Sequence, residues 1–257
     1  MLFPLLTVGG MLVIFLSTAL GASVVFFFKG EISTKINALF LGFASGVMVA
    51  TSVWSLILPA LETFTGASLQ FSCMLVALAL VVGGLFLSGL GYLTKRLETK
   101  GNSAKIKAKR LFFAVTLHNI PEGLAVGFAF GTAFIHGTLG GYITAFALAV
   151  GIAFQNLPEG MAVALPMKTA MHSNKKAFLF GVGSGVVEPI FALFGYFTAT
   201  LLRGVQPYLL AFSAGAMLFV TADDLLPDSK IKDGKSIGAW GFMLGFSVMM
   251  LLDILLG

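Results

Sequence analysis

Long apolar runs separated by short polar segments dominate the sequence. Eight such runs can be marked, and each is long enough for a helix to cross a bilayer, which takes about 20 apolar residues. The first run has no charge before it and is longer than the apolar core of a signal peptide, so we expect a retained helix. The pattern predicts an all-α integral membrane protein in which residues 1–257 form a single transmembrane domain. Its eight transmembrane helices are expected at Phe3–Phe28, Ile36–Ala60, Gln70–Leu93, Leu111–Thr132, Tyr142–Pro166, Ala177–Leu202, Pro207–Leu226 and Ile237–Leu256.

The composition favours the same class of protein. Of the 257 residues, 58% are hydrophobic and 11% are charged, whereas soluble domains carry about 25% charged residues. The single cysteine, Cys73, excludes a disulfide framework and a thiolate-cluster metal site. No nucleic-acid partner is expected, because basic residues are not interleaved with aromatic ones on a polar surface. The expected location is the cell membrane, with the lipid bilayer as a partner, and a homodimer is left open.

Basic residues gather in alternate connections between the apolar runs. The first, third, fifth and seventh connections hold two, seven, three and three Lys or Arg residues, which is 15 of the 16, and only Arg203 lies elsewhere. Loops rich in Lys and Arg stay in the cytoplasm. Because the number of spans is even, we expect both termini to be extracytoplasmic and the loop at about residues 94–110 to be cytoplasmic. We interpret that loop as a solvated orientation signal.

Two matched polar motifs interrupt the fourth and fifth runs. Residues 118–126 read HNIPEGLAV and residues 155–163 read QNLPEGMAV, so that both contain Asn-x-Pro-Glu-Gly-x-Ala-Val. Positions three and four residues apart share one side of a helix. Each motif therefore presents a carboxylate and two other polar groups on one side, and the two sets together predict a cation site between the fourth and fifth helices. These candidate ligands are His118, Asn119, Glu122, Gln155, Asn156 and Glu159.

Glu122, Glu159 and Glu188 lie near the centres of three successive spans. An acidic side chain there costs about 2.5–3.5 kcal/mol on insertion scales, so each needs a partner or a water-filled path. The spans contain no Lys or Arg for them to pair with. Protonated carboxyl groups hydrogen-bonded inside the bundle are an alternative, but a bound cation explains the set better. Pro121 and Pro158 each remove a backbone hydrogen bond, which widens the helix locally beside these carboxylates.

The two motifs resemble the paired motifs of the ZIP (Zrt/Irt-like protein) family of divalent-metal transporters, in its prokaryotic form. The resemblance extends to residues 184–189, which read SGVVEP, and to residues 222–227, which read ADDLLP. It implies a centre for two metal ions between the fourth and fifth helices. One ion would be held by His118, Glu122, Gln155 and Glu159, with Met48 as a further ligand, and the other by Asn119, Glu122, Asn156, Glu159 and Glu188.

The resemblance also implies a path for the ion along Ser55, Asp223 and Asp224. Met48 has an alternative interpretation as a flexible core residue, which is the more usual role of methionine. In many family members a histidine stands where this chain has Gln155. An amide oxygen is a weaker ligand than an imidazole for borderline metals, so Gln155 predicts a broad range of transported ions.

We therefore predict a transporter that imports zinc, together with iron, manganese or cobalt, into the cytoplasm. Carboxylates, amides and one imidazole suit all of these divalent cations. No catalytic cofactor and no enzymatic activity are expected. A selective metal-ion channel is the first alternative. An intramembrane metal-dependent hydrolase is less favoured, because it would need a His-Glu-x-x-His helix or a second intramembrane histidine.

Overall fold

The computed structural model describes residues 2–28, 33–62, 68–97, 103–199, 201, 204–230 and 236–256. Within these residues the chain forms helices and turns and no strand. Eight helical stretches are long and apolar enough to cross a membrane. The predicted fold class and number of spans are therefore confirmed.

Several spans consist of more than one helical segment. The second and seventh spans each contain a short π-helical turn, η2 and η3. The spans, in chain order, are α1 (Leu2–Ala22) with η1 (Ser23–Phe27), α2 (Thr34–Thr51) with η2 (Ser52–Ile57) and α3 (Leu58–Glu62), α4 (Leu69–Leu97), α5 (Ser103–His136), α6 (Leu139–Met171), α7 (Asn174–Gly185) with α8 (Val187–Thr198), α9 (Gln206–Val220) with η3 (Thr221–Leu225) and α10 (Leu226–Asp228), and α11 (Ile237–Leu256).

Two helices continue well beyond the predicted apolar runs. The expected loop at residues 94–110 is helical where it is described, because α4 runs to Leu97 and α5 begins at Ser103. Its residues 98–102 lie outside the described part. The helices extend into this connection because Ala, Lys and Arg are good helix formers even where they are too polar for the membrane. The neighbouring membrane spans end at Leu93 and begin at Leu111, and the cytoplasmic position of the connection remains a prediction. Likewise α6 passes Pro166 and stops only at Met171, where His172 takes a left-handed conformation with φ 52°, a common way to end a helix.

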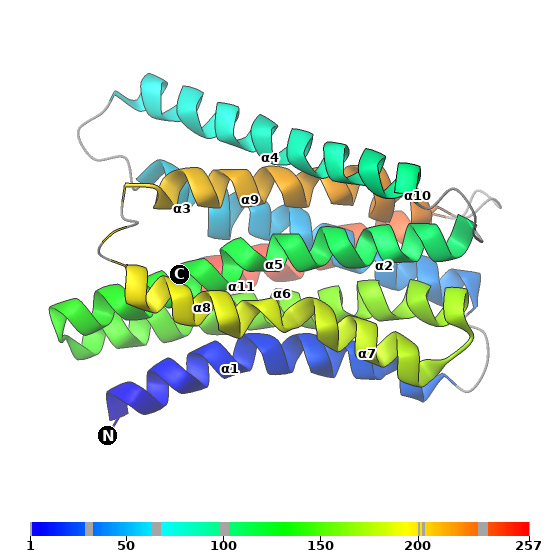
Figure 1. Ribbon diagram of the computed structural model, residues 1–257, viewed down its shortest axis with the longest axis horizontal. Helices are drawn as coiled ribbons and strands as arrows, with labels where there is room; N and C mark the ends of the chain where they lie inside the picture. Colours follow the sequence, from blue (N-terminus) through cyan, green and yellow to red (C-terminus); the bar gives the residue numbers. More distant parts are fainter. Residues whose placement is uncertain are drawn as a thin grey trace.

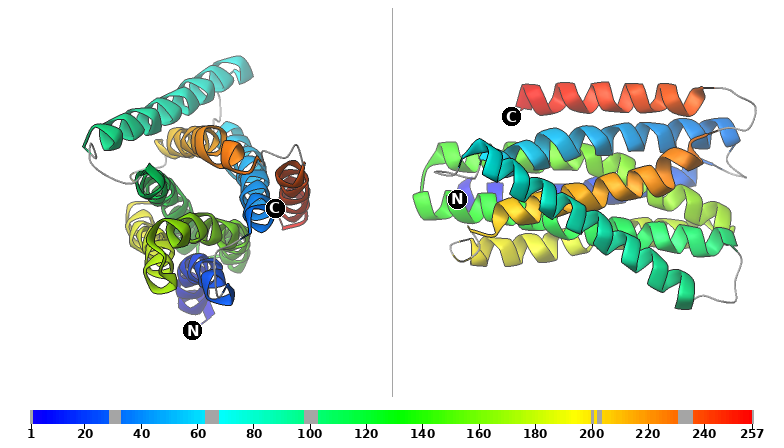
Figure 2. Two further views of the ribbon diagram at one scale, coloured as in Figure 1. Left: turned by 90° about the vertical axis from the view of Figure 1, so that its right-hand side faces the viewer. Right: turned by 90° about the horizontal axis from the view of Figure 1, so that it is seen from above.

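The helices form two neighbouring groups (Figures 1 and 2). In one group α1 packs on α6 and α5 packs on α8, with α5 and α6 side by side. In the other, α11 packs on α2 and α4 packs on α9. The two groups meet where α2 contacts α6 and where α5 contacts α9. Both chain ends lie at the same end of the bundle (Figure 1), as an even number of spans requires. Which side of the membrane that end faces remains a prediction. It rests on the distribution of the basic residues, and some of these lie outside the described residues, among them Lys29, Lys100 and Arg203.

The glycines of the two motifs allow very close helix packing. A Cβ atom at Gly123 would overlap the carbonyl oxygen of Glu188 on α8, and one at Gly160 would overlap the carbonyl oxygen of Thr18 on α1. Small residues at such positions let two helix backbones touch in a membrane. As a result α8 lies directly against the first motif and α1 against the second, which brings the side chains of Glu188 and Thr18 beside the polar residues of α5 and α6.

Candidate metal centre

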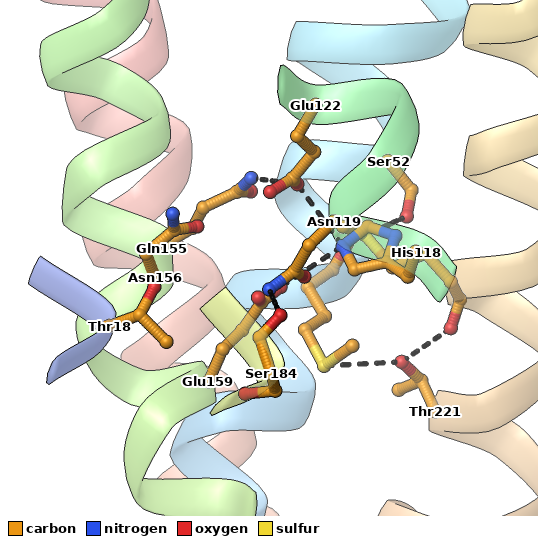
Figure 3. Close-up of polar contacts among 12 residues, drawn as sticks. Thr18, Ser52, His118, Asn119, Glu122, Gln155, Asn156, Glu159, Ser184 and Thr221 are labelled. Carbon is orange, nitrogen blue, oxygen red and sulfur yellow. Dashed lines mark hydrogen bonds and ion pairs between the residues drawn. The ribbon is translucent and has the colours of Figure 1, made fainter. Parts of the chain in front are cut away.

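The two motifs bring their polar side chains together inside the bundle (Figure 3). The contributing helices are α5 and α6, which run side by side, and the i, i+1 and i+4 spacing keeps the polar groups of each motif on one side of its helix. Every member is buried, with at most 1% of its surface exposed. The members are His118, Asn119 and Glu122 from α5 and Gln155, Asn156 and Glu159 from α6.

An imidazole and two carboxylates form the centre of this cluster. The Nε2 atom of His118 lies 3.1 Å from Oε1 of Glu122 and 3.1 Å from Oε1 of Glu159. The amide nitrogen of Gln155 donates a hydrogen bond to Glu122 (Figure 3). One ligand atom from each of His118, Glu122 and Glu159 can be chosen so that all three lie within 4.8 Å of one another. These three groups are therefore close enough to share one divalent cation.

Each of the six side chains also has one atom with no hydrogen-bond partner. These atoms are His118 Nδ1, Asn119 Oδ1, Glu122 Oε2, Gln155 Oε1, Asn156 Oδ1 and Glu159 Oε2. A buried polar atom without a partner costs about 1–3 kcal/mol, and five of these six are oxygens that can only accept. Among the described residues, His118 is the one basic side chain that contacts these carboxylates. A cation would satisfy the unpartnered oxygens and the negative charge together.

Glu188 joins the cluster from α8 and is completely buried. Its Oε1 atom accepts hydrogen bonds from Thr18 Oγ1 at 3.0 Å and from Asn119 Nδ2 at 2.9 Å. Its Oε2 atom accepts from Asn156 Nδ2 at 2.7 Å. Both carboxylate oxygens therefore already have protein donors. Thr18 was not found from the sequence, because a lone hydroxyl in an apolar run carries no motif that would distinguish it.

Met48 is fully buried in α2 and belongs to an apolar cluster that also includes Met217 of α9. Thr221 Oγ1 lies 3.8 Å from the sulfur of Met48, and Ser52 Oγ lies 2.8 Å from the sulfur of Met217. In each contact a hydroxyl group of one span lies against a methionine sulfur of the other, so the second and seventh spans contact each other twice. They agree with the core interpretation of Met48, whereas its predicted role as a ligand remains a prediction.

The residues expected along the ion path lie on the two π-helical turns. Ser55, on η2, donates a 2.6 Å hydrogen bond to Oδ1 of Asp253 on α11. On η3 the two aspartates differ, because Asp224 is only 5% exposed and Asp223 is exposed. The three residues thus belong to the second and seventh spans, and their part in an ion path remains a prediction.

Comparison with known proteins is informative for most of the chain. Residues 92–253, which include both motifs, match the model of a family described as ZIP zinc transporter. The chain is 32% identical to zinc transporter ZIP11 of Homo sapiens, over 93% of this chain and 94% of that protein. It is 35% identical to zinc transporter ZIPB of Bordetella bronchiseptica, over 95% of this chain and 79% of that protein. It is 31% identical to zinc transporter ZupT of Chlorobium phaeovibrioides, over 94% of each.

Proposed function

The chain belongs to the ZIP family of zinc transporters, and on this basis we propose that it imports zinc into the cytoplasm through a two-cation site between α5 and α6. The family is one of transporters and not of enzymes, which removes the hydrolase alternative. The chain is a multi-pass protein of the cell membrane and transports divalent metal ions, chiefly zinc. The direction of transport, the ligands and the further metals are our proposal.

The single observation that supports this site is the set of six buried atoms without partners in the two motifs. In our proposal one cation is bound by His118, Glu122, Gln155 and Glu159. A second cation is bound by the amide oxygens of Asn119 and Asn156 and shares the two bridging carboxylates. Glu188 contributes a third negative charge beside them, and Met48 remains a candidate ligand of the first cation.

Burial of the site supports a carrier in preference to an open channel. All six side chains of the motifs have at most 1% of their surface exposed, so a cation bound among them would have no open route to either side. Transport through such a site requires a second conformation that opens it. In this proposal Ser55, Asp223 and Asp224 lie along the route by which the cation enters or leaves.

The donor set supports a range of divalent cations. Carboxylate and amide oxygens with a single imidazole form a harder site than a cluster of histidines or cysteines. We therefore propose that iron, manganese and cobalt are transported in addition to zinc. The amide of Gln155 is the ligand that we hold responsible for this range, because the equivalent position in the first motif is His118.

The test is zinc uptake by purified protein in proteoliposomes. Glu122→Gln and Glu159→Gln keep the shape of the side chain and remove one bridging charge, so each variant should lose zinc uptake. Glu62→Gln is the matched control, because it makes the same chemical change at an exposed position and should leave uptake unchanged. Wild-type uptake should saturate with zinc concentration, as expected of a carrier. Normal uptake by either motif variant would refute the proposed site.

A further inference from the structure

An apolar groove with a volume of about 540 Å³ lies between four of the helices. The helix of the second motif, α6, contributes Phe154, Leu157 and Pro158, and α1, α2 and α11 supply most of the remaining lining. The groove is therefore lined by both groups of helices, since α1 packs on α6 and α2 packs on α11. Pockets that hold small ligands measure about 300–1,000 Å³, so this groove has room for a further molecule.

Close backbone packing on both sides keeps the groove open. On one side, a Cβ atom at Gly21 of α1 would overlap the carbonyl oxygen of Leu157 on α6. On the other side, a Cβ atom at Gly46 of α2 would overlap the carbonyl oxygen of Phe242 on α11. Helices whose backbones already touch cannot shift separately to fill a space beside them. An empty groove would forfeit packing contacts along its whole lining, so we expect it to hold another molecule.

The lining offers little to a polar ligand or to water. None of the residues that line the groove is charged, and Ser17 supplies the one hydroxyl group. That hydroxyl already donates a hydrogen bond to the carbonyl oxygen of Ala153. A buried water needs about two to four polar partners, which this lining does not provide. The groove is suited to a hydrocarbon.

The groove also lies where hydrocarbon is the solvent. Its lining segments are near the middle of four membrane spans, at residues 13–20, 43–47, 150–158 and 248–252. At its rim Leu16, Phe154 and Val248 are exposed, so the groove is continuous with the apolar surface that faces the bilayer. The molecules that reach it from there are membrane lipids.

We infer that the groove is a binding site for one acyl chain of a membrane phospholipid. The chain is held by contacts with apolar side chains of both helix groups, and its headgroup stays outside the groove at the membrane surface. On α6 the chain contacts Leu157 and Pro158, which stand between Asn156 and Glu159 in the second motif. The inference goes beyond the proposed function and does not depend on it, because it concerns a lipid and not the transported cation.

The first test uses the wild-type protein. Crystals grown from a lipid phase that contains phospholipid brominated at the middle of its acyl chains should show an anomalous bromine peak in the groove, beside Val47, Leu157 and Leu252. A groove without bromine would overturn the inference. So would a groove filled by a helix of a second copy of the protein.

The second test compares two variants that make the same chemical change. Val248→Phe adds a ring at the rim of the groove, whereas Val81→Phe adds it on α4, away from the groove. Both valines are exposed, so both variants should fold. Native mass spectrometry in detergent should show one tightly bound phospholipid on wild type and on Val81→Phe. Val248→Phe should bind it about 10-fold more weakly, because losing the burial of two methylene groups already has an effect of this size. Equal retention by the two variants would overturn the inference.

The same measurement separates an acyl-chain site from a headgroup site. Wild-type protein should retain an anionic and a zwitterionic phospholipid with identical chains equally well, because the lining of the groove carries no charge. It should retain a short-chain phospholipid much less. Retention of the anionic lipid alone would indicate that the headgroup is recognised at a basic surface, and would overturn the inference.

Discussion

Replacing Gly160 by alanine should weaken both the fold and the proposed zinc site, although the change adds a single methyl group. The new Cβ atom would overlap the carbonyl oxygen of Thr18 on α1 and crowd the backbone nitrogen of Ala22. Both neighbours are backbone atoms, which cannot turn aside as a side chain can. To restore an ordinary contact, α1 and α6 must move apart by about 1 Å.

The magnitude follows from this displacement. Forcing an extra methyl group into a well-packed interior costs about 1–3 kcal/mol, and each kcal/mol lowers the unfolding temperature by about 2–4 °C for a chain of this size. The hydrogen bond from Thr18 to Glu188 is 3.0 Å long, and an increase of about 1 Å would take it beyond the length at which it counts as a bond. If this hydrogen bond helps to position Glu188 beside the proposed metal site, zinc affinity should then fall by about 10-fold.

Gly151→Ala is the matched control for this prediction. Gly151 lies on the same helix, and a Cβ atom there meets no heavy atom within 4 Å. The intrinsic preference of alanine over glycine in a helix, about 1 kcal/mol, applies to both variants and cancels in their difference. The measurements are thermal unfolding in detergent and the KM for zinc in proteoliposomes. If the two variants have the same unfolding temperature and the same KM, the close approach of α1 to α6 does not matter and the reasoning is wrong.

Three further predictions concern other parts of the molecule. Gln155→His should tighten zinc binding and narrow the range of transported metals, because imidazole is the stronger ligand for zinc; competition uptake assays that find wild type and variant equally selective would contradict this. In a Cys73→Ser background, Lys105→Cys should react with an impermeant thiol reagent only from the cytoplasmic side and Gly140→Cys only from outside, and the reverse labelling would overturn the predicted orientation. Lys168→Met should lower the free energy of unfolding by about 1–3 kcal/mol with little change in KM, because Nζ donates to carbonyl oxygens at the end of the first span; an unchanged unfolding temperature in detergent would refute it.

The eight spans and the two motifs could be predicted from the sequence because both are local properties. A run of about 20 apolar residues is long enough to cross a bilayer whatever surrounds it. The spacing of His118, Asn119 and Glu122 puts them on one side of any helix. The helix ends were less predictable. A change to polar residues marks the edge of the membrane and not the end of the helix, so α5 begins at Ser103 although its apolar part begins at Leu111.

The sequence alone determined which residues are candidates for the metal site, because carboxylates in apolar runs are conspicuous wherever they occur. Only the tertiary structure decided which atoms of those residues are already satisfied and which are free. The two oxygens of Glu188 are occupied because α1, α5 and α6 converge on it, and Thr18 takes part only because Gly160 lets two backbones touch. Hydrogen-bond partners about 30 to 170 residues apart in the chain depend on how helices pack, which no local spacing records.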